Sequence, residues 1–218
     1  ANSWQQTPAG HEIREMMRDG GPWVIDGEPV MRAEIVDFWA MVFNPSTVHR
    51  LVHVWIGCFI VGAAFVMSIA AWYIVHRRHV EFARRSFTGG LLLLAAASLA
   101  AFLSGDLQAR NVAQTQPAKM AAFEGHFHTG PADFSVFGWP DEEEETIRAN
   151  VAIPGGLSWM LTGDPKAPLI GLDSFRPEDR PPVLVPYITY HIMIGTAVYF
   201  AGLSLVACVL RWRGTQFD

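Results

Sequence analysis

The chain has 218 residues and a formal net charge of −5, and 50% of its residues are hydrophobic but only 17% are charged. An ordinary soluble domain carries about 25% charged residues, so this composition excludes a disordered chain and argues against a purely soluble fold. The negative charge provides no basic surface for DNA or RNA, and we expect no nucleic-acid partner. The two cysteines, Cys58 and Cys208, lie in apolar runs, which excludes a disulfide framework and a cysteine-based zinc site.

The first segment, residues 1–50, contains one predicted helix. Apolar residues in 31–43 recur at spacings of three, one and three, which is the period of an amphipathic helix, and Trp39 suits a membrane interface. Asn44-Pro45 ends this pattern, and Ser46 is the expected N-cap of the next helix. Because the chain starts with Ala1 and has no signal-peptide pattern, we expect it to be cut from a longer protein.

Three uncharged stretches are long enough to cross a bilayer: residues 51–75, 86–104 and 183–210. About 20 apolar residues span the hydrocarbon core as a helix, so we predict transmembrane helices over 51–76, 86–104 and 183–210. A buried soluble helical hairpin is the alternative, but three such stretches in one chain of this length are rare in soluble proteins. The predicted fold class is therefore an all-α membrane protein.

Charge predicts the orientation of these helices. The connection 77–85 has four arginines and one glutamate, whereas the connection 105–182 has 12 acidic and 6 basic residues. The positive-inside rule places 77–85 and the end, 211–218, in the cytoplasm, and places 1–50 and 105–182 on the outer side. We expect 105–182 to be a long periplasmic loop with short helices, one of them over 117–127 and opened by proline. Its length favours a binding role over a simple connection.

Two histidines, His53 and His191, lie at similar depth near the outer ends of two predicted membrane helices. A histidine in such a helix needs a compensating interaction, and axial ligation of a haem would provide it for both. A hydrogen bond to a neighbouring helix is the alternative. Met193 offers a sulfur ligand, and at two residues' separation its side chain points about 200° away from that of His191. Spacing alone leaves a His53/His191 pair and a His53/Met193 pair open.

Lys119 and Glu124 are candidates for a site that binds a quinone head group and exchanges protons with it. They are five residues apart, or about 140° around a helix, and two solvated surface charges are the alternative interpretation. His126 and His128 form a His-x-His pair, which is a weak signal for zinc.

Six motifs follow one another along the chain: ANSWQQTP at 1–8, FNPSTVHRLVH at 43–53, FARRSF at 82–87, GD at 105–106, QPAKMAAFEG at 116–125 and HIM at 191–193. In this order and spacing the chain resembles subunit I of the cytochrome bd-type quinol oxidases over essentially its whole length. The short loop after the fifth motif resembles that of the short quinol-loop, cyanide-insensitive-type branch.

The resemblance implies roles for individual residues. His53 and Met193 correspond to the ligands of a low-spin haem b, and Lys119 and Glu124 correspond to the binding and catalytic residues of the quinol loop. His191 stands near that haem, where many members have an arginine.

The resemblance also implies that the chain is the central part of a quinol:oxygen oxidoreductase in the bacterial cytoplasmic (inner) membrane. Such an enzyme oxidises ubiquinol or menaquinol at the periplasmic face and contains a further haem b, a haem d or b, a subunit II and a small accessory subunit. The alternative functions are a non-redox proton or ion transporter subunit, whose histidines line a proton path, and a membrane anchor subunit. Neither alternative has a haem absorption band.

Overall fold

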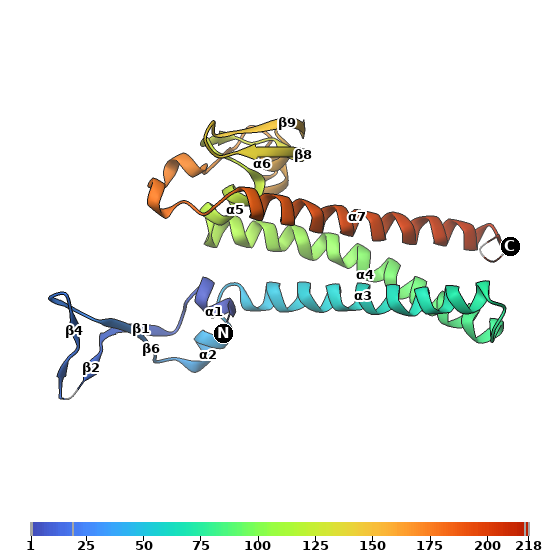
Figure 1. Ribbon diagram of the computed structural model, residues 1–218, viewed down its shortest axis with the longest axis horizontal. Helices are drawn as coiled ribbons and strands as arrows, with labels where there is room; N and C mark the ends of the chain where they lie inside the picture. The colour runs from blue at the N-terminus through green and yellow to red at the C-terminus, as the bar shows by residue number, and fades with distance from the viewer. Residues whose placement is uncertain (1, 19, 216, 218) are drawn as a thin grey trace. The chain divides into compact units, whose positions relative to one another are not determined.

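A computed structural model describes residues 2–18, 20–215 and 217. The chain divides into two compact units, Ala1–Leu51 and Val52–Asp218. The first unit consists of short elements that precede the first long helix, and the second contains the long helices with the segment that connects the last two of them (Figure 1).

The first unit is mainly short strands. Its elements are α1 (Asn2–Gln6), β1 (His11–Glu15), β2 (Met17–Arg18), β3 (Gly21–Pro22), β4 (Val24–Ile25), β5 (Glu28–Pro29), β6 (Met31–Ile35) and α2 (Phe38–Val42). β1 pairs antiparallel with β6, while β2–β3 and β4–β5 form two shorter pairs. The hydroxyl of Thr7 bonds to Ser46 at 2.6 Å and donates to Asn44 at 2.9 Å, so this buried cluster joins the N-terminal segment to the residues just before the long helix.

The amphipathic helix predicted over 31–43 is wrong in its first part, where the chain forms β6. The backbone of β6 is paired with β1, a partner about 20 residues away that the spacing of apolar residues in one segment cannot reveal. Helix begins only after Asp37, whose carboxylate accepts a hydrogen bond from Ala40 N at 2.9 Å. Ser46 does precede the long helix, but its hydroxyl bonds to Ser3 and Thr7.

Three helices are long and apolar enough to cross a membrane: α3 (Thr47–Val75), α4 (Val80–Thr115) and α7 (Leu184–Trp212). Their number agrees with the sequence prediction. α4 is longer than the predicted 86–104 because it starts within the stretch 77–85 and continues past Gly105, where Arg110 and Asp106 form an i,i+4 ion pair at 2.9 Å. The turn between α3 and α4 is correspondingly short.

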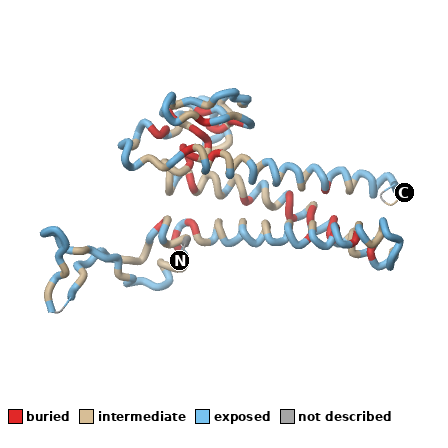
Figure 2. Tube along the Cα trace, in the orientation of Figure 1, coloured by how far each residue is buried: buried red, intermediate tan, exposed pale blue. Residues whose placement is uncertain are grey.

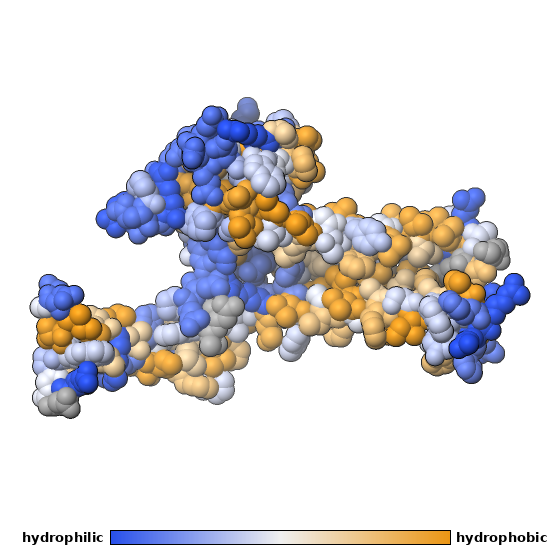
Figure 3. Space-filling model, in the orientation of Figure 1, coloured by the Kyte–Doolittle hydropathy of each residue, from blue (hydrophilic) through white to orange (hydrophobic). Residues whose placement is uncertain are grey.

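Burial differs sharply along these helices (Figure 2). One buried cluster joins α3 to α4 and contains Ala63, Met67, Leu91 and Leu94. Most of α7 is exposed, although the helix packs on α4 and α5. Long exposed apolar surfaces of this kind suit a lipid solvent, and the space-filling view shows hydrophobic side chains along the length of the helices (Figure 3).

The segment between α4 and α7 folds into short helices and short antiparallel strands. Its elements are α5 (Pro117–Glu124), β7 (Gly130–Pro131), β8 (Phe134–Asp141), β9 (Thr146–Ile153), α6 (Gly156–Thr162), β10 (Pro168–Leu169), η1 (Leu172–Ser174) and η2 (Pro177–Asp179). α5 begins at Pro117 as predicted but ends at Glu124 and not at 127, and the strands make the all-α fold class wrong here, as in the first unit. Aromatic and β-branched residues make β8 and β9 an antiparallel hairpin with two irregularities in its register.

Candidate functional site

α5 is short because both of its ends are specified by the sequence. Pro117 occupies the first turn, where its missing N–H costs nothing. Gly125 ends the helix with a left-handed φ of 63°. A Cβ at Gly125 would lie 3.0 Å from Ile147 and 3.3 Å from Tyr187, so the close packing of α5 against β9 and α7 also requires a glycine.

Glu124, the last residue of α5, is almost completely buried, with 2% of its surface exposed. Neither carboxylate oxygen makes a hydrogen bond within the described part of the chain. Burial raises the pKa of Glu124 to about 7, and the nearby Tyr190 hydroxyl on α7 partly opposes this effect. Glu124 is therefore a carboxylate whose proton is exchanged near neutral pH.

Aromatic rings connect Lys119 with Glu124. The Nζ atom of Lys119 lies 5.4 Å from the ring centroid of Phe123, and the Phe123 ring stacks on Tyr190 at 5.1 Å. The Tyr190 hydroxyl in turn interacts with the Glu124 carboxylate. We call Lys119, Phe123, Glu124 and Tyr190 the α5–α7 cluster. Both residues predicted for quinol chemistry therefore lie on α5, Lys119 in its first turn and Glu124 at its end, and the Phe123 and Tyr190 rings link them to the helix that bears Met193.

His53, on α3, contacts the middle of α4. Its Nδ1 atom lies 2.9 Å from Ser104 Oγ, and that hydroxyl donates its one hydrogen to the carbonyl of Ala101 at 3.2 Å. When Ser104 donates to Ala101, it accepts from His53, and this tautomer has the hydrogen on Nδ1 and the lone pair on Nε2. Nε2 has no hydrogen-bond partner among the described residues. A histidine oriented in this way through its other nitrogen fits an axial metal ligand.

His191 and Met193 have different surroundings on α7. Nδ1 of His191 lies 2.8 Å from the carbonyl oxygen of Tyr187, and Nε2 lies 2.8 Å from that of Ser135. Because both ring nitrogens are engaged, neither is open to an iron atom in this structure. The Met193 side chain, by contrast, is about half exposed, at 51%. Its thioether is accessible and would supply a sulfur ligand to a haem beside α7.

Three residues fasten the β8–β9 hairpin to α7, and we call Ser135, Tyr187 and His191 the hairpin latch. The hydroxyls of Ser135 and Tyr187 are 2.6 Å apart and both residues are buried. The His191 ring stacks on Tyr187 at 4.0 Å while it bonds to the Ser135 backbone. His191 is thus a structural contact between the loop and the helix of Met193.

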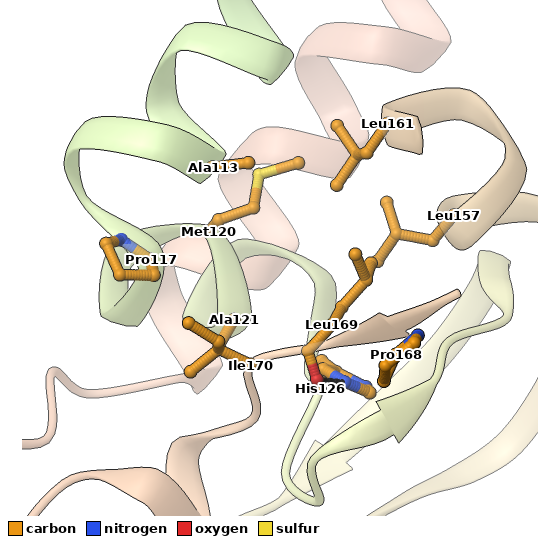
Figure 4. Close-up of a pocket in the computed structure, with 10 residues that line it drawn as sticks. All are labelled: Ala113, Pro117, Met120, Ala121, His126, Leu157, Leu161, Pro168, Leu169 and Ile170. Carbon is orange, nitrogen blue, oxygen red and sulfur yellow. Dashed lines mark hydrogen bonds between the residues drawn. The ribbon is translucent and has the colours of Figure 1, made fainter. Parts of the chain in front are cut away.

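A cavity of about 210 Å³ lies on another side of α5. Met120 and Ala121 of α5, Leu157 and Leu161 of α6 and the ring of His126 line it, and Figure 4 shows the apolar side chains converging from these elements. Lys119 and Glu124 are not among its lining residues.

The His-x-His pair is split between two environments. His126 is half-buried, with Nε2 3.3 Å from the Leu169 carbonyl, and burial lowers its pKa. His128 is exposed and lies 3.8 Å from Glu145. Within the described ranges no group of three or more histidine, cysteine, aspartate or glutamate side chains could hold a metal ion.

The sequence analysis missed Ser104, Ser135, Tyr187 and Tyr190. Tyr187, Tyr190 and His191 share one side of a helix at spacings of three and four, and this pattern of polar rings in an apolar helix was the available signal. The serines had no comparable signal, because their partners come from other helices or from the hairpin.

Comparisons with known proteins identify the family of the chain. The family model described as Cytochrome bd terminal oxidase subunit I matches residues 1–217. Cytochrome bd-II ubiquinol oxidase subunit 1 of Escherichia coli (strain K12) is 34% identical over 183 residues, which are 83% of this chain and 33% of that protein. Cytochrome bd ubiquinol oxidase subunit 1 of Bacillus subtilis (strain 168) is 28% identical over 209 residues, or 91% of this chain and 42% of that protein.

The fold is also similar to that of a solved structure, the bd oxidase from Geobacillus thermodenitrificans. The TM-score is 0.78 at 27% sequence identity, and the match covers 100% of this chain and 46% of that one. The chain thus spans between a third and a half of the length of these relatives. With a family model that matches nearly every residue and a fold that agrees with it, the chain belongs to the cytochrome bd terminal oxidase subunit I family.

Proposed function

We propose that the chain is the quinol-oxidising part of a cytochrome bd-type terminal oxidase in a bacterial inner membrane. The observation that carries the proposal is the buried Glu124, whose carboxylate has a pKa of about 7 and lies beside the Tyr190 hydroxyl on the helix of Met193. Quinol oxidation needs a proton acceptor beside an electron acceptor. Glu124 is the proton acceptor, and it contacts the helix of Met193, the candidate ligand of the haem that accepts the electrons.

Each member of the site has a defined task. Lys119 donates a hydrogen bond to a quinol oxygen and so binds and orients the head group. Glu124 takes a proton from the quinol hydroxyl as the ring is oxidised. Tyr190 positions the Glu124 carboxylate and excludes water from it.

The residues for a low-spin haem b are His53, through Nε2, and Met193, through its sulfur. Such a haem, when bound, accepts electrons one at a time and passes them on. Ser104 keeps the His53 ring in the ligating tautomer. His191 stays near the haem as part of the hairpin latch.

The long connection is the periplasmic quinol loop in this proposal, and the basic turn after α3 lies in the cytoplasm. Protons taken from ubiquinol or menaquinol are then released outside. Reduction of oxygen takes place at further haems, of the b and d or b types, held by parts of the subunit outside this chain and assembled with subunit II and a small accessory subunit.

Rapid mixing of the intact, anaerobic enzyme with quinol tests the proposal. We expect the low-spin haem band to appear quickly in the wild type and slowly in Glu124→Gln, and dithionite to reduce both equally. The absence of any haem band would instead favour the transporter alternative.

Met193→Leu should convert the low-spin spectrum to a high-spin one, whereas His191→Ala should keep it low-spin. The reverse result would establish bis-histidine ligation.

A further inference from the structure

The outer face of the β8–β9 hairpin is apolar and uncovered. Its exposed hydrophobic residues, with the exposed fraction of each, are Val136 (53%), Phe137 (67%), Trp139 (57%), Val151 (61%) and Ile153 (55%). Phe137 and Val151 are paired across the two strands, so their side chains lie on the same face. We call these five residues the hairpin patch. A strand pair that faced water would place polar residues there.

The opposite face of the hairpin is fixed to α7. Ser135 and Pro140 are buried, and Ser135 belongs to the hairpin latch. A Cβ at Gly138 would lie 3.2 Å from the Tyr187 hydroxyl, so the strand backbone packs directly on the helix. The hairpin therefore moves with α7, and its height relative to the bilayer follows from the height of that helix.

Two hydrogen bonds define this height. At the tip, the Glu142 carboxylate accepts from the backbone N–H of Leu184, the first residue of α7, at 3.0 Å. At the open end, the Ser135 carbonyl lies 2.8 Å from His191. His191 is seven residues further along α7, or about 10 Å deeper at 1.5 Å per residue. The hairpin therefore runs beside the helix from its outer end inward.

The length of α7 converts this depth into a position in the membrane. A helix of 29 residues is about 43 Å long, and a hydrocarbon core of about 30 Å leaves roughly four residues of overhang at each end. The hydrocarbon boundary then lies near residue 188. The open end of the hairpin, beside His191, lies at or just inside this boundary, while the tip lies among the head groups or in water.

The distribution of charged residues along the hairpin agrees with these depths. The tip is the acidic run 141–145, and Arg148 of β9 forms ion pairs with Asp141 and Glu144 toward that end. Beyond the open end, the carboxylate of Asp133 accepts from Gly155 N at 2.7 Å, and the strand residues at that end, 134–137 and 150–153, carry no charge. Figure 3 shows the same division in the part of the molecule that Figure 1 labels β8 and β9. Hydrophilic residues lie on its left side in this view, and hydrophobic residues lie on its right side, near the two strand labels.

We propose that the hairpin patch inserts into the boundary between head groups and acyl chains of the outer leaflet, so that its partner is membrane lipid. α7 itself exposes apolar side chains such as Ile192 and Val198, and the aromatic side chains of the patch are the kinds that concentrate at this boundary. The inference rests on the membrane-spanning assignment of α7, and it does not depend on quinol oxidation.

Site-directed fluorescence on the intact enzyme in phospholipid nanodiscs tests this proposal. Val151→Cys is labelled with bimane in an active background in which Cys58, Cys208 and the cysteines elsewhere in the enzyme are replaced. Glu143→Cys, at the exposed acidic tip, is the matched control on the same hairpin. We expect phospholipids with a nitroxide near the glycerol to reduce the fluorescence of the label at 151, and iodide in the buffer to have little effect. The label at 143 should respond mainly to iodide.

Other results would overturn the proposal. Quenching of the label at 151 by iodide would show that the patch faces water. Protection from both quenchers would show that another part of the enzyme covers it. Ile153→Cys provides a second reporter if Val151→Cys disturbs strand pairing, and the same outcomes apply to it.

Discussion

Glu124 illustrates how much the surroundings of one residue decide its chemistry. A solvated glutamate is a weak base at neutral pH, but burial disfavours the charged form and raises the pKa of Glu124 to about 7, against the smaller opposing effect of the Tyr190 hydroxyl. The sequence allowed two solvated charges at 119 and 124 as an alternative. The burial of Glu124 could not be deduced from its spacing to Lys119, because β9 and α7, which are distant in sequence, create it.

The raised pKa of Glu124 predicts a pH dependence with a definite sign. A general base must be deprotonated, so quinol oxidation should become faster as pH rises toward about 7 and then level off. Below pH 7, kcat/KM should fall about tenfold per pH unit. In Glu124→Gln this limb should disappear together with most of the turnover. A profile of the wild type that is flat from pH 5 to pH 8 would contradict the assignment of the base.

Lys119 should affect binding more than turnover. Lys119→Ala removes a hydrogen-bond donor to quinol, and we expect KM for quinol to increase about tenfold with a smaller change in kcat. Lys166, also in the loop but outside the α5–α7 cluster, provides the control variant Lys166→Ala. Steady-state kinetics with quinol measure both variants, and equal effects of the two would rule out a specific role for Lys119.

The role of His53 as a haem ligand can be distinguished experimentally from the role of Ser104, which orients the His53 ring. His53→Ala should abolish the low-spin haem signal, because Met193 alone is a weak ligand. Ser104→Ala should retain haem but shift its reduction potential, because the Nδ1 hydrogen bond that orients the ring is lost. Redox titration followed by absorbance distinguishes the two effects. A normal low-spin spectrum in His53→Ala would exclude this residue as a ligand.

At the scale of elements, long apolar stretches were more predictable than short ones. α3 and α7 agree closely with the stretches 51–75 and 183–210, because a bilayer demands about 20 apolar residues in one run. β6 and the β8–β9 hairpin were missed, because strand pairing depends on a partner segment that the local pattern does not identify. The extension of α4 beyond residue 104 was missed because the uncharged stretch used for the prediction ends there.

The hairpin latch predicts a local change in stability. Tyr187→Phe leaves Ser135 without its 2.6 Å contact and should destabilise docking of the hairpin by about 1–2 kcal/mol. Amide hydrogen exchange in β8 should then become roughly tenfold faster, with the haem spectrum unchanged. Thr189→Val is the control, since that hydroxyl is exposed and bonds within α7. Unchanged exchange in Tyr187→Phe would show that the latch does not hold the hairpin.

At the scale of the whole molecule, the charge asymmetry predicts sidedness. Arg78→Cys lies in the basic turn after α3 and Glu143→Cys in the acidic run of the long connection. In intact spheroplasts, a membrane-impermeant maleimide should label the cysteine at 143 and should reach that at 78 only after lysis. Labelling in the opposite order would show that the topology is the reverse of the predicted one, with the α5–α7 cluster on the cytoplasmic side.

The continuous helix α4 has a consequence for how this protein tolerates changes in length. It connects Ser104, the partner of His53, to α5 through regular helix up to Thr115. Inserting one residue between these points would advance everything beyond it by about 1.5 Å and rotate it by about 100°. Glu124 would then leave its buried position beside Tyr190. An insertion of a full helical turn would nearly restore the direction in which α5 leaves α4. An insertion between Glu143 and Glu144 at the hairpin tip changes no helical phase and keeps Glu142 beside the start of α7, so length can change there but not in the segment from 105 to 115.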